Sequence, residues 1–134
     1  MVKKTSIQHI QSLKEFEGLK QDWEHLLDQY KNETIFLTWE WLYAWWKHNQ
    51  EGKRLWLLTA RQDNNLIGIA PLMLSSQKKH GMSFRLLQTL GTPNTDQSDF
   101  IALNNDPEIV MQFCNYILTQ KNAWDAIELN EHKD

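Results

Sequence analysis

Four tryptophans occur within eight residues, and this cluster restricts the possible folds more than any other feature of the chain. They are Trp39, Trp41, Trp45 and Trp46. Each indole has roughly 150–250 Å² of surface to bury, and an exposed group of such rings would promote association. Thr38 is a favourable N-cap, so a helix is expected from there to about His48. We therefore expect this helix to lie in a core or at an interface.

The length and charge of the chain exclude several classes of protein. Its 134 residues and single cysteine indicate one domain, residues 1–134, that folds without a disulfide. We expect Cys114 to be a small buried hydrophobic residue within an apolar helical pattern. The formal net charge is −3 and the basic residues are dispersed, which argues against binding to nucleic acid or to an anionic membrane surface. Because no apolar run has transmembrane length and polar residues follow Lys4, we expect a cytoplasmic protein without a membrane span.

Hydrophobic periodicity predicts a mixture of strands and helices. Strands are expected at residues 5–10, 54–61, 66–74, 83–90, 99–103 and 126–129, and helices at about 12–30, 38–48 and 107–121. The first helix begins with a capping-box pair, Ser12 and Glu15, and residues 63–65 are typical of a turn in an antiparallel hairpin. Pro71 should mark a bulge or a separation of strands, and residues 77–81 a polar loop. The order β-α-α-β-β-β-(β)-α-β predicts an α+β fold: a mixed, mainly antiparallel sheet with helices on its faces.

Three segments, taken in order, resemble one family. They are Phe36–Leu42 with Trp45 and Trp46, Leu66–Leu72, and Leu90–Gly91 followed by Asp96 and Asp99–Phe100. The first is similar to F-x-[ST]-x-E-W-[LM]-x-x-W-[WF], the second to L-[IV]-G-[IV]-[AL]-P-L and the third to L-G … D-x-x-D-F. These patterns resemble the CelD-like, cellulose-biosynthesis-type branch of the GNAT acetyltransferase superfamily, over about residues 20 to 103.

The resemblance implies a GNAT-like half of a FemABX-like protein, of which this chain would be the N-terminal half. Such proteins resemble acyl-CoA-dependent N-acyltransferases, so acetyl-CoA or another acyl-CoA is expected for the full-length protein. The donor-binding portion normally lies in the second half. The partner would then be that second half or a homo-oligomer partner, and the acceptor a small-molecule or sugar amine. The chain is either a fragment or a naturally short protein.

The approach to the third helix is a poor site for a coenzyme pyrophosphate. Phosphate binds where backbone N–H groups at a helix N-terminus are free, usually after glycines. Here the approach is Leu103–Pro107, with no glycine or basic residue, an aspartate at the cap position and a proline that lacks an N–H. We therefore expect no cofactor site in this chain.

Acyl transfer to an amine needs a group that accepts a proton, and three carboxylates are candidates for this role. Glu40 stands among the tryptophans, and Asp96 and Asp99 lie in or beside a turn-rich loop. Their alternative roles are helix N-terminal stabilisation for Glu40 and turn formation for the two aspartates. The five histidines show no spacing for a metal site.

The tryptophans likewise have two interpretations. Trp39, Trp41, Trp45 and Trp46 either pack a core or form an acceptor-binding or interface surface. Two functions from different classes follow. The chain is either the acceptor-side half of a GNAT-type N-acyltransferase without its own donor site, or a non-catalytic GNAT-like binding module that uses the Trp-rich helix.

Overall fold

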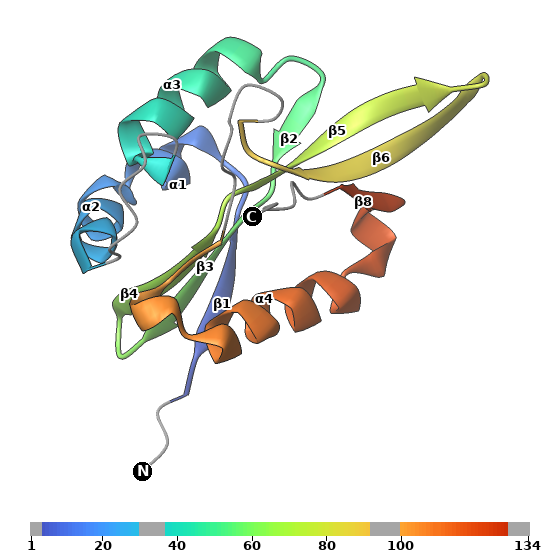
Figure 1. The fold of residues 1–134 in the computed structure, drawn as a ribbon. Helices are drawn as coiled ribbons and strands as arrows, with labels where there is room; N and C mark the ends of the chain where they lie inside the picture. Colours follow the sequence, from blue (N-terminus) through green and yellow to red (C-terminus); the bar gives the residue numbers. More distant parts are fainter. Residues whose placement is uncertain (1–3, 30–36, 92–99, 129–134) are drawn as a thin grey trace, which may run out of the picture.

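The computed structural model describes residues 4–29, 37–91 and 100–128, which form two four-stranded sheets with helices on both faces (Figure 1). The first sheet has the order β1-β3-β4-β7 and the second the order β2-β5-β6-β8. The strands are β1 (Ser6–Ile10), β2 (Lys53–Leu55), β3 (Leu57–Gln62), β4 (Asn65–Ala70), β5 (Leu72–Lys79), β6 (Met82–Thr89), β7 (Ile101–Ala102) and β8 (Ala126–Glu128). The α-helices are α1 (Leu13–Glu17), α2 (Lys20–Gln29), α3 (Trp39–Asn49) and α4 (Pro107–Thr119), and the short 3₁₀ helices are η2 (Leu103–Asn105) and η3 (Lys121–Ala123). The predicted α+β class is confirmed.

The predicted first helix is divided in two. The Ser12 hydroxyl accepts the N–H of Glu15 at 3.1 Å, which confirms the predicted cap. The helix that follows is only one turn long. The N–H of Gly18 bonds to Lys14 O and caps α1, and Gly18 and Leu19 separate α1 from α2. The apolar repeat continues through the break, since Phe16, Leu19 and Trp23 are all buried. The single continuous helix was therefore a wrong prediction.

Each of two long extended segments is divided by a single residue into one strand of the first sheet and one strand of the second. Trp56 lies between β2 and β3, and Pro71 lies between β4 and β5. Proline has no N–H to donate to a ladder, so the predicted strand separation at Pro71 is confirmed. Hydrogen bonds still cross both junctions, from Trp56 N–H to Leu72 O at 3.1 Å and from Leu90 N–H to Pro71 O at 2.7 Å. The two sheets are thus joined covalently and by hydrogen bonds at this point.

The hairpins are antiparallel, and one is longer than expected. Asp63 and Asn64 have φ of 50° and 66°, which confirms the predicted turn between β3 and β4. β5 continues to Lys79 and pairs with β6 up to Met82, so the polar loop expected at residues 77–81 is mostly strand. Polar side chains do not prevent pairing in an exposed ribbon, because its backbone hydrogen bonds are independent of side-chain polarity.

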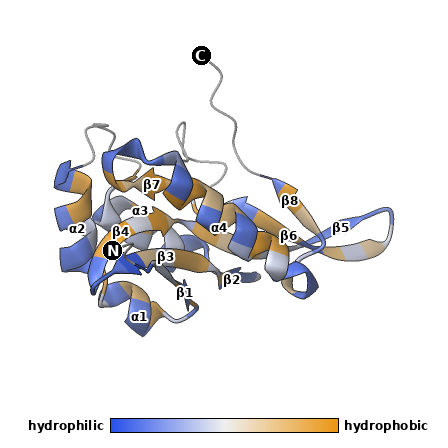
Figure 2. Ribbon diagram, turned by 90° about the horizontal axis from the view of Figure 1, so that it is seen from below, coloured by the Kyte–Doolittle hydropathy of each residue, from blue (hydrophilic) through white to orange (hydrophobic). Residues whose placement is uncertain are grey.

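Helices pack on both faces of the first sheet, and the β5–β6 hairpin extends beyond them (Figure 1). One face carries α1, α2 and α3, and its core contains Phe16, Trp23 and Trp39. The other face carries α4, and its core contains Trp56 and Phe113. Hydrophobic and hydrophilic residues alternate along α2 and α4, as expected for helices with one buried face (Figure 2).

The helix α4 begins as predicted but presents its cysteine outward. Asp106 is the N-cap and accepts the N–H of Glu108 at 2.9 Å, with Pro107 in the first turn. Cys114 is exposed, which corrects the expected buried position. Its neighbour Phe113 is fully buried instead, because one face of α4 packs on the sheet and the larger ring takes that face. No helix in the described ranges is long and apolar enough to cross a membrane.

Candidate functional site

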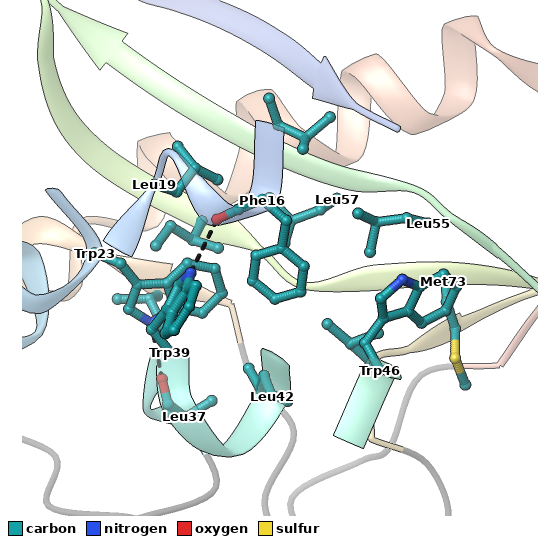
Figure 3. Packing of buried hydrophobic residues seen from close by; sticks show 14 of the residues in the cluster. Phe16, Leu19, Trp23, Leu37, Trp39, Leu42, Trp46, Leu55, Leu57 and Met73 are labelled. Atoms are coloured by element: carbon teal, nitrogen blue, oxygen red, sulfur yellow. Dashed lines mark hydrogen bonds between the residues drawn. The ribbon is translucent and has the colours of Figure 1, made fainter. Parts of the chain in front are cut away.

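The Trp-rich helix contributes most of its indoles to the core. Trp39, Trp45 and Trp46 are at most 9% exposed, and Trp41 is partly buried against the same core. Trp39 Nε1 donates a hydrogen bond to Phe16 O at 2.9 Å, and its ring stacks on Tyr43 at 4.4 Å. Figure 3 shows this hydrogen bond together with the packing of Trp46 beside Met73 of β5. These indoles therefore fix α3 against the sheets, and an acceptor-binding or interface role for them remains a prediction.

Glu40 lies on the outer surface of α3. It occupies the first turn of the helix, where a carboxylate interacts favourably with the N-terminal dipole. Its neighbour on α2 is Glu24, whose pKa is raised mainly by a hydrogen bond with Glu40, and further by desolvation and by the charge of that carboxylate. Both side chains are exposed. Asp96 and Asp99, the other predicted carboxylates, lie outside the described residues.

The N-terminus of α4 borders a small cavity of about 360 Å³. Gln62, Leu103, Asn104 and Asp106 contribute to its wall, and none of the described wall residues is basic. The Asp106 carboxylate already occupies the N-cap position, where a phosphate would otherwise accept hydrogen bonds. A phosphate here would meet a negative charge instead of free N–H groups, so this arrangement is unfavourable for a pyrophosphate.

A row of hydrogen-bonded polar side chains crosses the second sheet. Gln88 of β6 donates from Nε2 to Glu128 Oε1 of β8 at 3.2 Å, and Ser75 Oγ of β5 donates to Gln88 Oε1 at 2.8 Å. Gln77 Nε2 in turn donates to Ser75 Oγ at 3.0 Å. We call these four residues the polar row. Ser75 is 3% exposed, so the row runs from a buried hydroxyl to an exposed carboxylate.

The polar row lies on an arrangement that often holds ligands. β6 and β8 are parallel, with α4 between them in sequence, and their last paired residues are Gln88 and Glu128. Ligands of α/β proteins commonly bind outside the carboxyl ends of parallel strands. Met73 pairs with Gln88 in the register, and Trp46 packs on Met73, so the Trp-rich helix ends beside the row. Sequence reasoning missed Glu128, because 40 residues separate it from Gln88 and no local pattern joins them.

The described residues contain no group of three or more His, Cys, Asp or Glu side chains placed to hold a metal ion. The arrangement is therefore one of carboxylate, amide and hydroxyl groups. A carboxylate that is held by one amide and open to solvent is able to accept a proton from a bound amine.

The chain has the fold of the GNAT acetyltransferases, as comparison with solved structures shows. A GNAT family acetyltransferase from Staphylococcus aureus matches with a TM-score of 0.55 and 16% identity, over 96% of this chain and 87% of that one. A ribosomal-protein-alanine N-acetyltransferase from Brucella melitensis matches with a TM-score of 0.54 and 12% identity, over 96% of this chain and 81% of that one.

A third similar structure is that of a predicted acetyltransferase from Clostridium acetobutylicum with acetyl-CoA. It has a TM-score of 0.52 and 8% identity, over 97% of this chain and 82% of that one. No protein-family model and no curated protein sequence matches the chain. At identities this low the likeness establishes the fold, and the site must be argued from its own residues.

Proposed function

We propose that this chain is a GNAT-type domain of an acyl-CoA-dependent N-acyltransferase and provides the acceptor side of the reaction. The acyl donor would be bound by a second GNAT-like half of the same protein or by a homo-oligomer partner, as in the CelD-like, FemABX-like arrangement that the sequence resembles. Acetyl-CoA or another acyl-CoA would be the donor, and a small-molecule or sugar amine the acceptor.

The observation that carries this proposal is the polar row at the carboxyl ends of β6 and β8. An amine must lose a proton when it attacks a thioester carbonyl. Glu128 is held by Gln88 at 3.2 Å and is exposed, so an amine can approach its second oxygen. Gln88 is held in turn by Ser75, which keeps the amide oriented toward the carboxylate. Glu128 is thus the described carboxylate that we assign as proton acceptor.

The N-terminus of α4 supports our proposal that this chain does not bind the acyl donor there. Asp106 caps the helix with its own carboxylate, and the adjoining cavity wall has no basic residue among those described. Isothermal calorimetry of the isolated chain with acetyl-CoA should therefore show no binding at α4. Micromolar binding that is abolished by a bulky substitution at Asn104, in that cavity, would contradict the acceptor-side assignment.

The role of Glu128 is tested by Glu128→Gln in the full-length protein. Glutamine has the same shape and still accepts a hydrogen bond from Gln88, so the fold should be unchanged. Thiol release from acetyl-CoA with a panel of polyamine, amino-sugar and lysine-peptide acceptors should fall by roughly 10²–10⁴-fold. Glu51→Gln, an exposed position beyond the end of α3, is the matched control and should retain the full rate. An undiminished rate for Glu128→Gln would refute the assigned role.

The alternative function is a non-catalytic module that docks a partner through the Trp-rich helix. Three of its four indoles are at most 9% exposed, so α3 offers little aromatic surface to a partner. A full-length protein that binds no acetyl-CoA and releases no thiol with any of the acceptors would favour this module over the enzyme.

A further inference from the structure

A second cavity among the described residues lies at the edge of β2. Its volume is about 1030 Å³, and its wall contains residues of β1, α3, β2, β5, β6 and η3. Small-molecule sites in proteins typically measure about 300–1,000 Å³, so this cavity is large enough for an organic ligand. We call it the β2-edge cavity.

The cavity exists because β1 is shorter than the sheet beside it. The pairing of β1 with β3 ends where Ile10 lies opposite Leu57, and the chain then turns away into α1. Among the described strands, β2 therefore pairs with β5 alone. Trp56 donates its N–H to Leu72 O and therefore faces β5 with its backbone groups. Successive residues of an antiparallel strand point their N–H and C=O groups alternately to the two sides, so those of Leu55 point away from β5.

The described residues of the wall carry positive charge. Lys53, Arg54 and Arg85 are among them, and none of these described wall residues is an aspartate or a glutamate. The whole chain, in contrast, has 17 acidic and 14 basic residues. The charge of Arg85 is offset by its ion pair with Asp125, so Lys53 and Arg54 give the wall its net positive charge. Such a wall attracts anions.

Of these three cations, Lys53 and Arg54 have N–H donors that are not used within the described residues. Arg85 is already paired with Asp125 at 3.1 Å, and the same pair lowers the pKa of Asp125. Lys53 Nζ makes one hydrogen bond, to Asn49 O at 3.0 Å, and has two further N–H groups. Arg54 makes no side-chain hydrogen bond or ion pair with another residue of the described ranges. An acidic group in the cavity would therefore find donors on Lys53 and Arg54.

Part of the remaining wall is apolar. Trp46 and Trp56 are each only 4% exposed, so they are held in place, and both contribute to the cavity wall together with Leu13 and Leu55. The imidazole of His9 lies 4.5 Å from the Trp56 ring. Gln11 donates to its Nδ1, so the second nitrogen, Nε2, carries the proton of the neutral ring. Nε2 is buried without an acceptor, and a ligand oxygen would supply one if the ring turned toward the cavity.

We propose that the β2-edge cavity binds a small organic anion, with a carboxylate or phosphate group held by Lys53 and Arg54 and an apolar body against Trp46 and Trp56. None of the four residues of the polar row contributes to the wall of this cavity, so the two sites share no side chain. The inference does not depend on the proposed acyltransferase function.

The test is a titration of the ¹⁵N-labelled chain followed by NMR at the indole N–H groups of Trp46 and Trp56. Benzoate and phenyl phosphate are the anionic probes, benzamide is the neutral control, and inorganic phosphate tests the acidic group alone. We expect saturable shifts at both indoles with the two organic anions, in the millimolar range or tighter. The relative affinity of the two anions identifies the preferred acidic group.

A charge reversal and its matched control make the test specific. Arg54→Glu should weaken binding by about tenfold or more, since a hydrogen bond to a charged group is lost and a repulsion is added. Lys79→Glu makes the same charge change at an exposed position on β5 outside the cavity and should change the affinity less than about twofold. Both variants should keep the wild-type circular dichroism.

Three results would overturn the proposal. They are the absence of saturable indole shifts, equal binding of benzamide and benzoate, and equal weakening by the two charge reversals. Inorganic phosphate that binds as tightly as phenyl phosphate would show that the apolar wall contributes nothing, and would overturn the organic part of the assignment. The calorimetric titration with acetyl-CoA concerns donor binding at the N-terminus of α4. It tests the proposed function independently of these indole shifts.

Discussion

Glu24 and Glu40 form a pair of like charges on neighbouring helices. The hydrogen bond between them requires a proton on one carboxyl, which is the main reason that the pKa of Glu24 is raised. A raised pKa means that the folded protein holds this proton more tightly than the unfolded chain does. The pair therefore favours folding below the ordinary pKa of glutamate, and this contribution disappears as the pH rises through the raised value.

Glu40→Gln should lower the pKa of Glu24 toward its ordinary value. The substituted amide has no charge to repel the Glu24 carboxylate and can donate a hydrogen bond to it. The measurement is a ¹³C NMR titration of the glutamate side chains, with Glu51→Gln as the control that leaves Glu24 unaffected. An unchanged Glu24 titration in Glu40→Gln would show that the two carboxyl groups are not in contact in solution.

Single residues also explain which local predictions were successful. Ser12, Thr38 and Asp106 each accept an N–H of the first turn of the following helix, as expected for these residue types. The exposed Cys114 was not predictable in this way, because periodicity places a residue on a face of α4 but does not determine where that face ends. Local chemistry therefore specified the helix starts more reliably than the burial of borderline positions.

At the scale of elements, α4 packs on β4 at a position that requires glycine. A Cβ atom on Gly68 would lie 2.6 Å from Ile109 Cγ2 and 3.0 Å from Phe113 Cε2. These distances are shorter than van der Waals contact, and both neighbours are buried on the sheet-facing side of α4. The close approach of helix and strand therefore depends on the missing side chain at this residue.

Gly68→Ala should destabilise the protein by about 1–3 kcal/mol, because the helix or the strand must move to accept the methyl group. Gly18→Ala is the control, since its φ is −69° and its nearest contact would be at an ordinary 3.5 Å. That variant should be neutral or slightly more stable, because alanine reduces the freedom of the unfolded chain. Urea denaturation of both variants measures the difference, and equal stabilities would contradict the packing described here.

On the scale of the whole molecule, the two cores share the first sheet. Leu57 and Ile69 face the core under α1, α2 and α3, whereas Leu58 and Ala70 of the same strands face the core under α4. Neither core keeps its sheet surface if the strands separate. The two faces are thus energetically coupled through β3 and β4.

The chain should consequently unfold in one cooperative transition. The indole N–H signal of Trp23 reports on the core under α1, α2 and α3, and that of Trp56 reports on the core under α4. Both should disappear at the same urea concentration, which should also be the midpoint of the change in far-UV circular dichroism. Midpoints that differ between the two indoles would show that the faces unfold separately.

Much of this fold was predictable from local patterns. The α+β class, the Trp-rich helix, the turn after β3 and the strand separation at Pro71 all depend on residues close together in the sequence. The Trp-rich helix was expected to be buried or to form an interface, and the structure places three of its indoles in the core. The division of the first helix was missed, because the apolar repeat continues across the two-residue break at Gly18 and Leu19.

The amino-acid sequence by itself determined the helix caps, the main turns and the residues available for a core, because these depend on side-chain chemistry within a few positions. Only the tertiary structure decided which distant residues meet. It brought Glu128 to Gln88 and left the edge of β2 open beside Arg54. The physical reason is that strand pairing is a non-local contact: its register depends on the packing of both faces together, and no short segment contains that information.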